Sequence, residues 1–385
     1  MSTAPIYLDY NATTPVDPAV LDAMLPFLRG EFGNPSSAHG LGSHAHDAVE
    51  AARAEVAALI GAAPDEIVFT SGGTEASNIA IRGAVRIDDS RRAVVTSTIE
   101  HPATEACCAF LEGEGHKVTR VVAGTDGLID AARVAAAISY KTALVTIIHA
   151  QNEIGTIQPL REIAAAARRH GALVHVDAAQ SVGKIAVNVK ELGADLLSIA
   201  GHKLYAPKGV GVLYIRRGIT LPPLLLGAGQ ERGRRPGTEN VPYIVGLGEA
   251  CRIAGVMLER ESKRLSALAG DLFAALKREI PGIILVGHPT QRLPNTLNVL
   301  FPNASGRKVL EKCSRVMAST GSACHADSEE PSAILTALRI AHDQALGAVR
   351  LSLGRGTKKE DVADAAADLA AAWRSVSAAS AVAAE

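Results

Sequence analysis

The sequence contains few aromatic residues and no excess of charge of either sign. Phe, Trp and Tyr together make up 3% of its 385 residues, so alanine and branched aliphatic side chains must form most of the core. The 40 acidic residues almost balance the 39 basic ones, whereas nucleic-acid-binding proteins usually carry a basic surplus. No uninterrupted apolar run reaches the roughly 18 residues that a membrane span requires. We therefore expect a globular protein that binds neither nucleic acid nor a membrane.

Cysteine is also scarce, and its spacing excludes two common structural roles. Cys107, Cys108, Cys251, Cys313 and Cys324 contain no C-x-x-C pair, so the sequence predicts neither a metal site nor a disulfide framework. The N-terminal residues MSTAPIYLDYN lack the basic and apolar regions of a secretory signal. Both absences favour a reducing, cytoplasmic setting.

Short aliphatic runs alternate with helical patterns through the first two thirds of the chain. The predicted strands are 66–70, 93–98, 143–150, 172–176, 194–200 and 209–215. Nearly continuous apolar runs separated by helices are typical of a parallel or mostly parallel sheet that helices cover on both faces. The sequence therefore predicts an α/β fold.

The last third of the chain has a different pattern of predicted helices and strands. From about Met257 it predicts a long helix, strands at 282–287, 296–301 and 347–354, and a final helix. That helix begins with a capping box, Thr357-x-x-Glu360. We predict a large domain at 15–256, and a small α+β domain formed by 1–14 and 257–385.

Polar residues follow five of the predicted strands, at the point where each strand ends. They are SGGTEASN, IEHPA, QNEIG, DAAQS and GHK, in chain order. Ligands of open α/β sheets bind beyond the carboxyl ends of the strands. One polar strand end would be ordinary, but five in series predict a functional site at this edge.

Three of these segments suggest a phosphorylated, heterocyclic cofactor. The Gly-rich turn at 71–78 enters a helix, and the N–H groups of a helix N-terminus favour an anion such as phosphate. Asp177 could hold a proton on a ring nitrogen, and Lys203 could bond an aldehyde, as pyridoxal phosphate requires. His101 could stack on the ring or simply be structural. Each feature has an ordinary alternative, namely a plain turn, a helix cap or a solvated loop lysine, but their combination favours the cofactor.

A series of motifs resembles the cysteine desulfurase family, a branch of the class V pyridoxal-phosphate-dependent enzymes, over about residues 5–372. The motifs are YLDYNATTP, GNPSSAHG, FTSGGTEASN, IEHPA, QNEIGTIQP, HVDAAQSVGK, GHKLYAPKGVG, RRPGTEN, STGSACHADSEEPS and VRLSLGR. The chain is also similar to selenocysteine lyases. The resemblance implies fold type I, with a mostly parallel seven-stranded sheet in the large domain and a smaller α+β domain, and it implies a homodimer.

The resemblance also implies which residues hold pyridoxal 5'-phosphate. Lys203 would form the Schiff base, Asp177 would pair with the pyridinium nitrogen, Gln180 would reach the ring oxygen, and His101 would stack on the ring and take part in catalysis.

The phosphate of the cofactor has its own implied partners. Gly73, Thr74 and His202 would bind it within one chain, and Thr238 would reach the phosphate of the other subunit. At the position three before the lysine, desulfurases usually have a phosphate-binding serine, whereas this chain has Ala200. We expect the change to remove one hydrogen bond to the phosphate.

The remaining implied roles concern the substrate. Asn152 and Arg350 would hold the carboxylate of L-cysteine, Arg350 through a bidentate fork, with Asn34 nearby. The Cys324 thiolate would take the substrate sulfur as a persulfide and pass it to an acceptor or scaffold protein, as in iron–sulfur cluster assembly. The other four cysteines lie in helix or strand patterns, and we predict that they are structural.

Three classes of function remain open on the sequence alone. The first is a cysteine desulfurase that forms L-alanine, or a selenocysteine lyase that releases selenide, since Ala200 is typical of the lyases. The second is another class V aminotransferase or lyase, which would not need Cys324. The third is a non-catalytic scaffold for sulfur acceptors, which would not need Lys203, Asp177 and His101 together.

Overall fold

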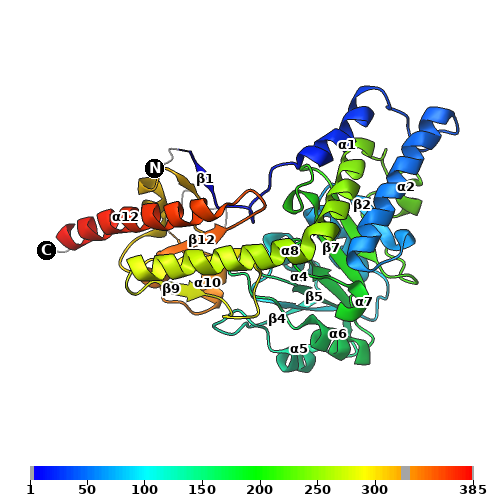
Figure 1. Ribbon diagram of the computed structural model, residues 1–385. Coiled ribbons are helices and arrows are strands. Elements are labelled where there is room, and N and C mark those ends of the chain that lie inside the picture. Colours follow the sequence, from blue (N-terminus) through cyan, green and yellow to red (C-terminus); the bar gives the residue numbers. More distant parts are fainter. Residues whose placement is uncertain (1–3, 322–329, 384–385) are drawn as a thin grey trace.

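The computed structural model describes residues 4–321 and 330–383. Figure 1 shows a large sheet with its helices on the right and a smaller sheet on the left, and the long helix α8 runs from one to the other. The structure confirms the predicted α/β class.

The large sheet has seven strands in the order β2-β8-β7-β6-β5-β3-β4. The strands are β2 Ile67–Thr70, β3 Ala93–Ser97, β4 Lys117–Val121, β5 Thr142–Ile148, β6 Leu173–Asp177, β7 Leu196–Ala200 and β8 Gly211–Ile215. β8 is antiparallel to both β2 and β7, while the pairings from β7 through to β4 are parallel. The mostly parallel, seven-stranded sheet that the resemblance implies is confirmed.

The edge strand β4 has no counterpart among the predicted strands. Lys117 is exposed and the next three residues are only half buried, because this strand lies at the end of the sheet. Its sequence KVTRV therefore lacks the continuous apolar run that marks the interior strands.

Helices cover both faces of the large sheet. They are α1 Pro18–Arg29, α2 Gly40–Ile60, α3 Gly73–Ala84, α4 Pro102–Gly113, α5 Ala131–Ala137, α6 Leu160–Arg169, α7 Val189–Leu192 and the short turns η1 Pro64–Glu66, η2 Gly201–Lys203 and η3 Gln230–Gly233. Neighbouring strand residues face opposite sides: Val94 packs in a cluster with α3 and α4, whereas Val95 packs in one with α2, α6 and α8. Two-sided burial explains the nearly continuous apolar runs.

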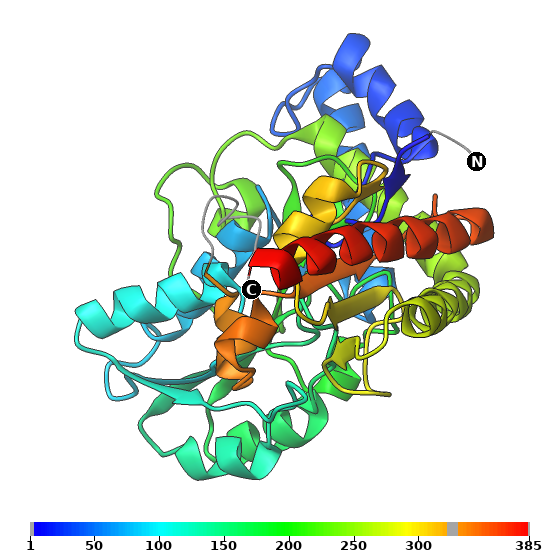
Figure 2. The same ribbon diagram turned by 90° about the vertical axis from the view of Figure 1, so that its left-hand side faces the viewer.

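The smaller sheet has the order β12-β10-β9 and a core of its own. Its elements are β9 Ile284–Val286, β10 Thr296–Leu300, α9 Gly306–Lys312, β12 Ala348–Ser352 and α12 Lys359–Ala383, with α10 Ala333–Ala337 and α11 His342–Ala345 preceding β12. Figure 2 shows α12 crossing in front of these strands. The N-terminal strand β1 Ile6–Tyr7 pairs with β11 Val316–Met317, and Ile6 and Leu8 lie in this same core.

Helix α8 spans Val241–Glu279 and contributes to both cores. Its buried residues up to Ala254 belong to the core of the large sheet, and those from Leu265 belong to the core of the small sheet. An 18-residue window of α8 has a mean hydropathy of 1.4, so the helix is long and apolar enough to cross a membrane by length and composition alone. We propose that the two domains meet within α8, at residues 256–257.

Candidate functional site

A cavity of about 750 Å3 lies at the carboxyl edge of the large sheet. The structure brings the following sequence-predicted residues to its wall: Gly73, Thr74, His101, Asn152, Asp177, Gln180, His202, Lys203 and Arg350. They come from strand ends of the large sheet, from the first turn of α3, and from β12 of the small sheet. The cavity therefore lies where the two cores meet.

Lys203 lies in the short turn η2, directly after β7. Its Nζ donates to the backbone oxygens of Asn11 at 2.6 Å and Ala12 at 2.7 Å. Burial, and then the charge of Arg350, lower the pKa of Lys203 to about 8, although nearby carboxylates oppose the shift. The amine is thus held in place and carries less charge near neutral pH than an ordinary lysine, whereas Lys208 is exposed in a turn.

Asp177 is the last residue of β6 and is 5% exposed. Its Oδ1 accepts a hydrogen bond from Ala179 N at 3.0 Å. Gln180 lies one turn further on, where its Nε2 donates to Asn11 O at 2.9 Å and its Oε1 accepts from Lys184 Nζ. A buried carboxylate and an anchored amide therefore border the same side of the cavity.

The N-terminus of α3 lies at another part of the wall. Within the described residues no side chain caps this helix, so its first N–H groups remain available to an anion. A Cβ placed on Gly73 would lie 3.2 Å from the Ala200 Cβ, so the end of β7 lies against this first turn. His202 Nδ1 lies 3.2 Å from Thr13 Oγ1, and burial lowers the pKa of His202 to about 4. This part of the wall suits a phosphate.

His101 is the N-cap of α4, with Pro102 as the first helical residue, as the sequence suggested. Its Nδ1 accepts from Ala103 N at 3.1 Å, which fixes the imidazole at the cavity. The preceding Glu100 also lines the cavity and is 5% exposed. Burial raises the pKa of Glu100 to about 8, so this carboxyl is largely protonated at neutral pH.

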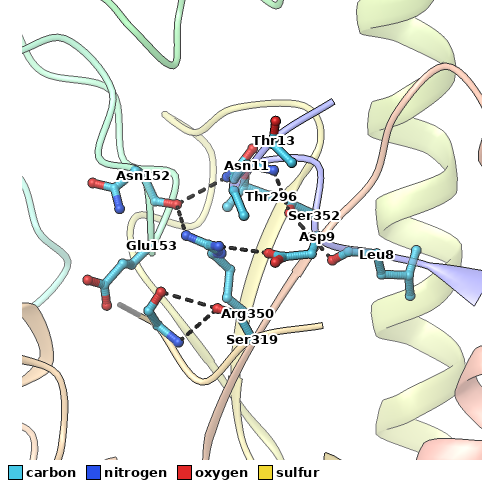
Figure 3. A network of polar contacts seen from close by, with 12 residues as sticks. Leu8, Asp9, Asn11, Thr13, Asn152, Glu153, Thr296, Ser319, Arg350 and Ser352 are labelled. Carbon is cyan, nitrogen blue, oxygen red and sulfur yellow. Dashed lines mark hydrogen bonds and ion pairs between the residues drawn. The ribbon is translucent and has the colours of Figure 1, made fainter. Parts of the chain in front are cut away.

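Arg350, in the middle of β12, provides the cationic side of the cavity (Figure 3). Its Nη2 donates to Asp9 Oδ1 at 2.7 Å, and its Nη1 lies 3.3 Å from Asn152 O. Its Nε has no hydrogen-bond partner among the described residues. The guanidinium is thus anchored at both terminal nitrogens, each of which carries a second N–H that can donate to a carboxylate.

Asn11 is the main residue of the site that sequence reasoning missed. Its backbone oxygen accepts from Lys203 and Gln180, and its Oδ1 accepts from Lys184 Nζ at 2.8 Å. Its Nδ2 donates to Thr296 Oγ1 at 2.8 Å. The motif YLDYNATTP contains Asn11, but nothing in the sequence pattern indicates contacts with residues 169 to 285 positions away.

Two predicted residues do not line this cavity, and a third lies outside the described part. Asn34 is exposed in the connection between α1 and α2, where its Oδ1 accepts from Ser36 N. Thr238 is exposed in the loop before α8. Their proposed roles remain predictions. The role implied for Thr238 is in the cavity of the other subunit, so this residue need not line the cavity of its own chain. Cys324 lies outside the described residues.

The other four cysteines are buried. They are Cys107, Cys108, Cys251 and Cys313, each at most 4% exposed. Burial raises the pKa of Cys108 and Cys251 to about 12, so neither is a thiolate at neutral pH. Their location agrees with the structural role predicted for them.

Comparisons with known proteins give a consistent result. Residues 6–364 match the model of the family described as aminotransferase class-V. A cysteine desulfurase of Nostoc sp. strain PCC 7120 is 45% identical over 359 residues, which cover 93% of this chain and 90% of the relative. Cysteine desulfurase IscS of Dictyoglomus turgidum is 44% identical over 93% of this chain and 91% of its own length.

Solved structures agree with these relatives. A NifS-like protein superposes with a TM-score of 0.90 at 36% identity, and the match covers 95% of this chain and 98% of the other. A structure titled SspA in complex with cysteine has a TM-score of 0.80 at 38% identity, covering 90% and 98% of the two chains.

Proposed function

This chain belongs to the class-V aminotransferase family, and from that premise we propose that it is a pyridoxal-phosphate-dependent cysteine desulfurase. It converts L-cysteine to L-alanine and transfers the sulfur. The observation that carries the proposal is the Lys203 amine, held at the cavity with its pKa lowered to about 8, beside the buried Asp177. The 45% identity to cysteine desulfurases over 93% of the chain supports the choice of reaction.

Several features of the cavity fit pyridoxal 5'-phosphate. The uncapped first turn of α3, with Gly73, Thr74 and the nearby His202, would hold the phosphate. Asp177 would face the ring nitrogen, and Lys203 would bond the aldehyde carbon. When bound, the cofactor supplies an electron sink for charge that develops at the substrate Cα.

Different side chains of the protein would bind the substrate, remove its Cα proton and accept its sulfur. Arg350 and Asn152 orient the substrate carboxylate. Lys203, as a free amine with a pKa near neutral pH, removes the Cα proton. The Cys324 thiolate attacks the substrate sulfur, so the Cβ–S bond breaks while an S–S bond forms. Cysteine plus the Cys324 thiol thus give alanine plus a Cys324 persulfide, with no external oxidant or reductant.

The proposed function can be tested by measuring where the substrate sulfur goes. We expect wild type to form alanine from L-cysteine and to show a Cys324 peptide heavier by one sulfur atom in mass spectrometry of the alkylated protein. Cys324→Ala should lose both persulfide and sulfide release while still binding the cofactor. Cys107→Ala, a buried cysteine, is the matched control and should retain them. Sulfide release that survives Cys324→Ala would instead indicate another class-V lyase.

Selenocysteine lyase activity is the second candidate, and the observation that favours it is Ala200. This residue lines the cavity against Gly73 and offers no hydroxyl to a phosphate. We propose that the enzyme also accepts L-selenocysteine, because a selenol ionises and leaves carbon more readily than a thiol. Turnover of both amino acids by wild type and Ala200→Ser is the direct test, and selenide formation alone would replace the first assignment.

The remaining proposals concern partners. We infer a homodimer, in which Thr238 of one subunit reaches the phosphate held by the other, and a cytoplasmic protein that delivers sulfur to an acceptor or scaffold. Sedimentation analysis and cofactor affinity of Thr238→Ala test the first point.

A further inference from the structure

Asp9 and Arg350 form an ion pair between the two ends of the chain, 341 residues apart. Asp9 follows β1 and forms a bridge with Ser352, two residues beyond Arg350 on β12. Backbone hydrogen bonds also join Ser352 N to Leu8 O, and Arg350 N to Ser319 O (Figure 3). The backbones on both sides of the pair are therefore fixed by β structure, so the geometry of the pair is well determined.

The surroundings make this pair different from a surface ion pair. The side chain of Arg350 is 4% exposed and that of Asp9 is 20% exposed. A buried guanidinium without an anion is strongly unfavourable. Among the described residues, Asp9 is the carboxylate within ion-pair distance of Arg350, and the Asn152 contact at 3.3 Å is long. The orientation of Arg350 therefore depends chiefly on Asp9.

We infer that Asp9 is a positioning residue, which holds the Arg350 guanidinium in the orientation that receives the carboxylate of the amino-acid substrate. The inference rests on the proposed function, in which Arg350 binds that carboxylate. Asp9 takes one N–H of Nη2 and Asn152 O takes one N–H of Nη1, so each terminal nitrogen keeps a second N–H that has no partner among the described residues. The arginine is thus fixed in direction while still able to form new hydrogen bonds.

The charge of Asp9 has a second consequence at Lys203. Burial and Arg350 lower the pKa of this amine, whereas Asp9 and Asp177 raise it. Within residues 4–321 and 330–383, the other titratable groups that face Lys203 are His101, Lys184 and His202. Removal of the Asp9 charge should therefore lower the pKa of Lys203 further. If Asp9 served only to connect β1 to β12, its substitution would not change this pKa.

A second pair in the same chain provides a matched control. Asp17 Oδ2 accepts from Arg355 Nη1 at 3.0 Å, so it too joins the N-terminal region to the segment after β12. Its side chain also caps α1 through Ala19 N. Neither Asp17 nor Arg355 lines the cavity. Asp17→Ala thus reports what the loss of a structural ion pair does to the protein.

The test compares Asp9→Asn and Asp9→Ala with Asp17→Ala in the holoenzyme. Asn keeps an oxygen that accepts from Nη2 but removes the charge, whereas Ala removes both. We expect Asp9→Ala to raise KM for L-cysteine about tenfold with kcat changed less than about threefold, since a charge-assisted hydrogen bond is lost. Asp9→Asn should raise KM by less than about threefold, and Asp17→Ala should lower the unfolding midpoint without changing KM.

A second measurement uses the cofactor-free protein. The rate at which an amine-acylating reagent labels Lys203 is followed against pH by peptide mass spectrometry. We expect the midpoint to fall in both Asp9 variants and to stay unchanged in Asp17→Ala. This measurement on Asp9→Asn decides the matter even if Asp9→Ala does not fold.

The outcomes separate the inference from the proposed function. If Arg350→Ala raises KM but Asp9→Ala leaves KM and the labelling midpoint at wild-type values, the inference is wrong. Equal KM changes in Asp9→Ala and Asp17→Ala would also overturn it. If wild type forms no alanine, or if Arg350→Ala leaves KM unchanged, the proposed function itself fails.

Discussion

Two of the regions that border the cavity differ in character, namely the carboxyl edge of the large sheet and the N-terminal segment 9–14. The sheet edge contributes the side chains proposed to act on the cofactor, such as Asp177 and Lys203. The N-terminal segment contributes groups that hold those side chains. The backbone oxygens of Asn11 and Ala12 accept from Lys203, and Asp9 holds Arg350. The side chains proposed to act on the cofactor and the groups that hold them therefore come from different parts of the chain.

The two regions also belong to different cores. The sheet edge is rigid because its strands are buried on both faces. Segment 9–14 is fixed at its start by Leu8, which lies in the core of the small sheet, and by the Asp9–Ser352 bridge. The cavity is therefore complete only when both cores are folded, so substitutions in the two regions should have different signatures.

The largest expected effect is at the sheet edge. We expect Lys203→Ala to lower alanine formation roughly a thousandfold, because it removes the amine that takes the Cα proton. Lys208→Ala is the matched control: this lysine is exposed in the turn five residues on, and its loss should leave turnover unchanged. Comparable losses in the two variants would mean that Lys203 acts only through the fold of this turn.

Asp177 and Asp195 test whether position along a strand decides function. Asp177 lies at the carboxyl end of β6, whereas Asp195 lies directly before β7, at the opposite edge of the sheet, where it accepts from Val174 N and Arg216. We expect Asp177→Asn to lower turnover on the order of a hundredfold, since it removes the charge proposed to face the ring nitrogen.

The control at the other edge should behave in the opposite way. Asp195→Asn loses a buried, charge-assisted hydrogen bond, so we expect a lower free energy of unfolding by about 1–3 kcal/mol with turnover kept. Urea titration and steady-state assays on both variants provide the measurements. A large loss of turnover in Asp195→Asn would contradict the division between the two edges.

The same division explains what the sequence could and could not predict. The sequence indicates Asp177 and Lys203 because Asp177 directly follows one apolar run and Lys203 comes three residues after another, and the ends of parallel strands share one edge. The contacts of Asp9 and Asn11 could not be found in this way, because their partners lie in distant elements and no local periodicity encodes such pairing. β4 was missed for a related reason, since an edge strand with Lys117 and Arg120 lacks the apolar run.

Asn11 tests the supporting region. Its side chain bonds Lys184, Asn295, Thr296 and the Asn152 backbone, while its backbone oxygen holds Lys203. Asn11→Ala keeps the backbone contact, so we expect a loss of about 2–4 kcal/mol in unfolding free energy but at most about a tenfold loss of turnover.

The helix-capping residue Asn188, outside the cavity, is the control for Asn11. Asn188→Ala should cost about 1 kcal/mol with no change in turnover. Calorimetry and steady-state kinetics distinguish the two. If Asn11→Ala abolishes turnover while the protein remains fully folded, segment 9–14 contributes a reacting side chain. The proposal that this segment only supports the side chains of the sheet edge would then be wrong.

The smallest effect on turnover is expected inside the sheet, at a buried chain of hydrogen bonds. His175 on β6 bonds Thr146 Oγ1 on β5 and Ser198 Oγ on β7, each at 2.8 Å, and Ser77 on α3 bonds Ser198. Burial lowers the pKa of His175 to about 3 from an ordinary value of 6.5, so the folded protein keeps it neutral.

His175 should therefore appear in the pH dependence of stability. Between pH 6.5 and 3 the unfolded chain binds a proton at His175 that the folded protein does not, so stability falls as pH falls through this window. His175→Gln removes the group that binds this proton. Between pH 3 and 6.5 we therefore expect the slope of unfolding free energy against pH to decrease by up to about 1.4 kcal/mol per pH unit. An unchanged slope in His175→Gln would mean that His175 binds a proton in the folded protein as readily as in the unfolded chain. The interior of the sheet would then be less rigid than its two-sided burial implies.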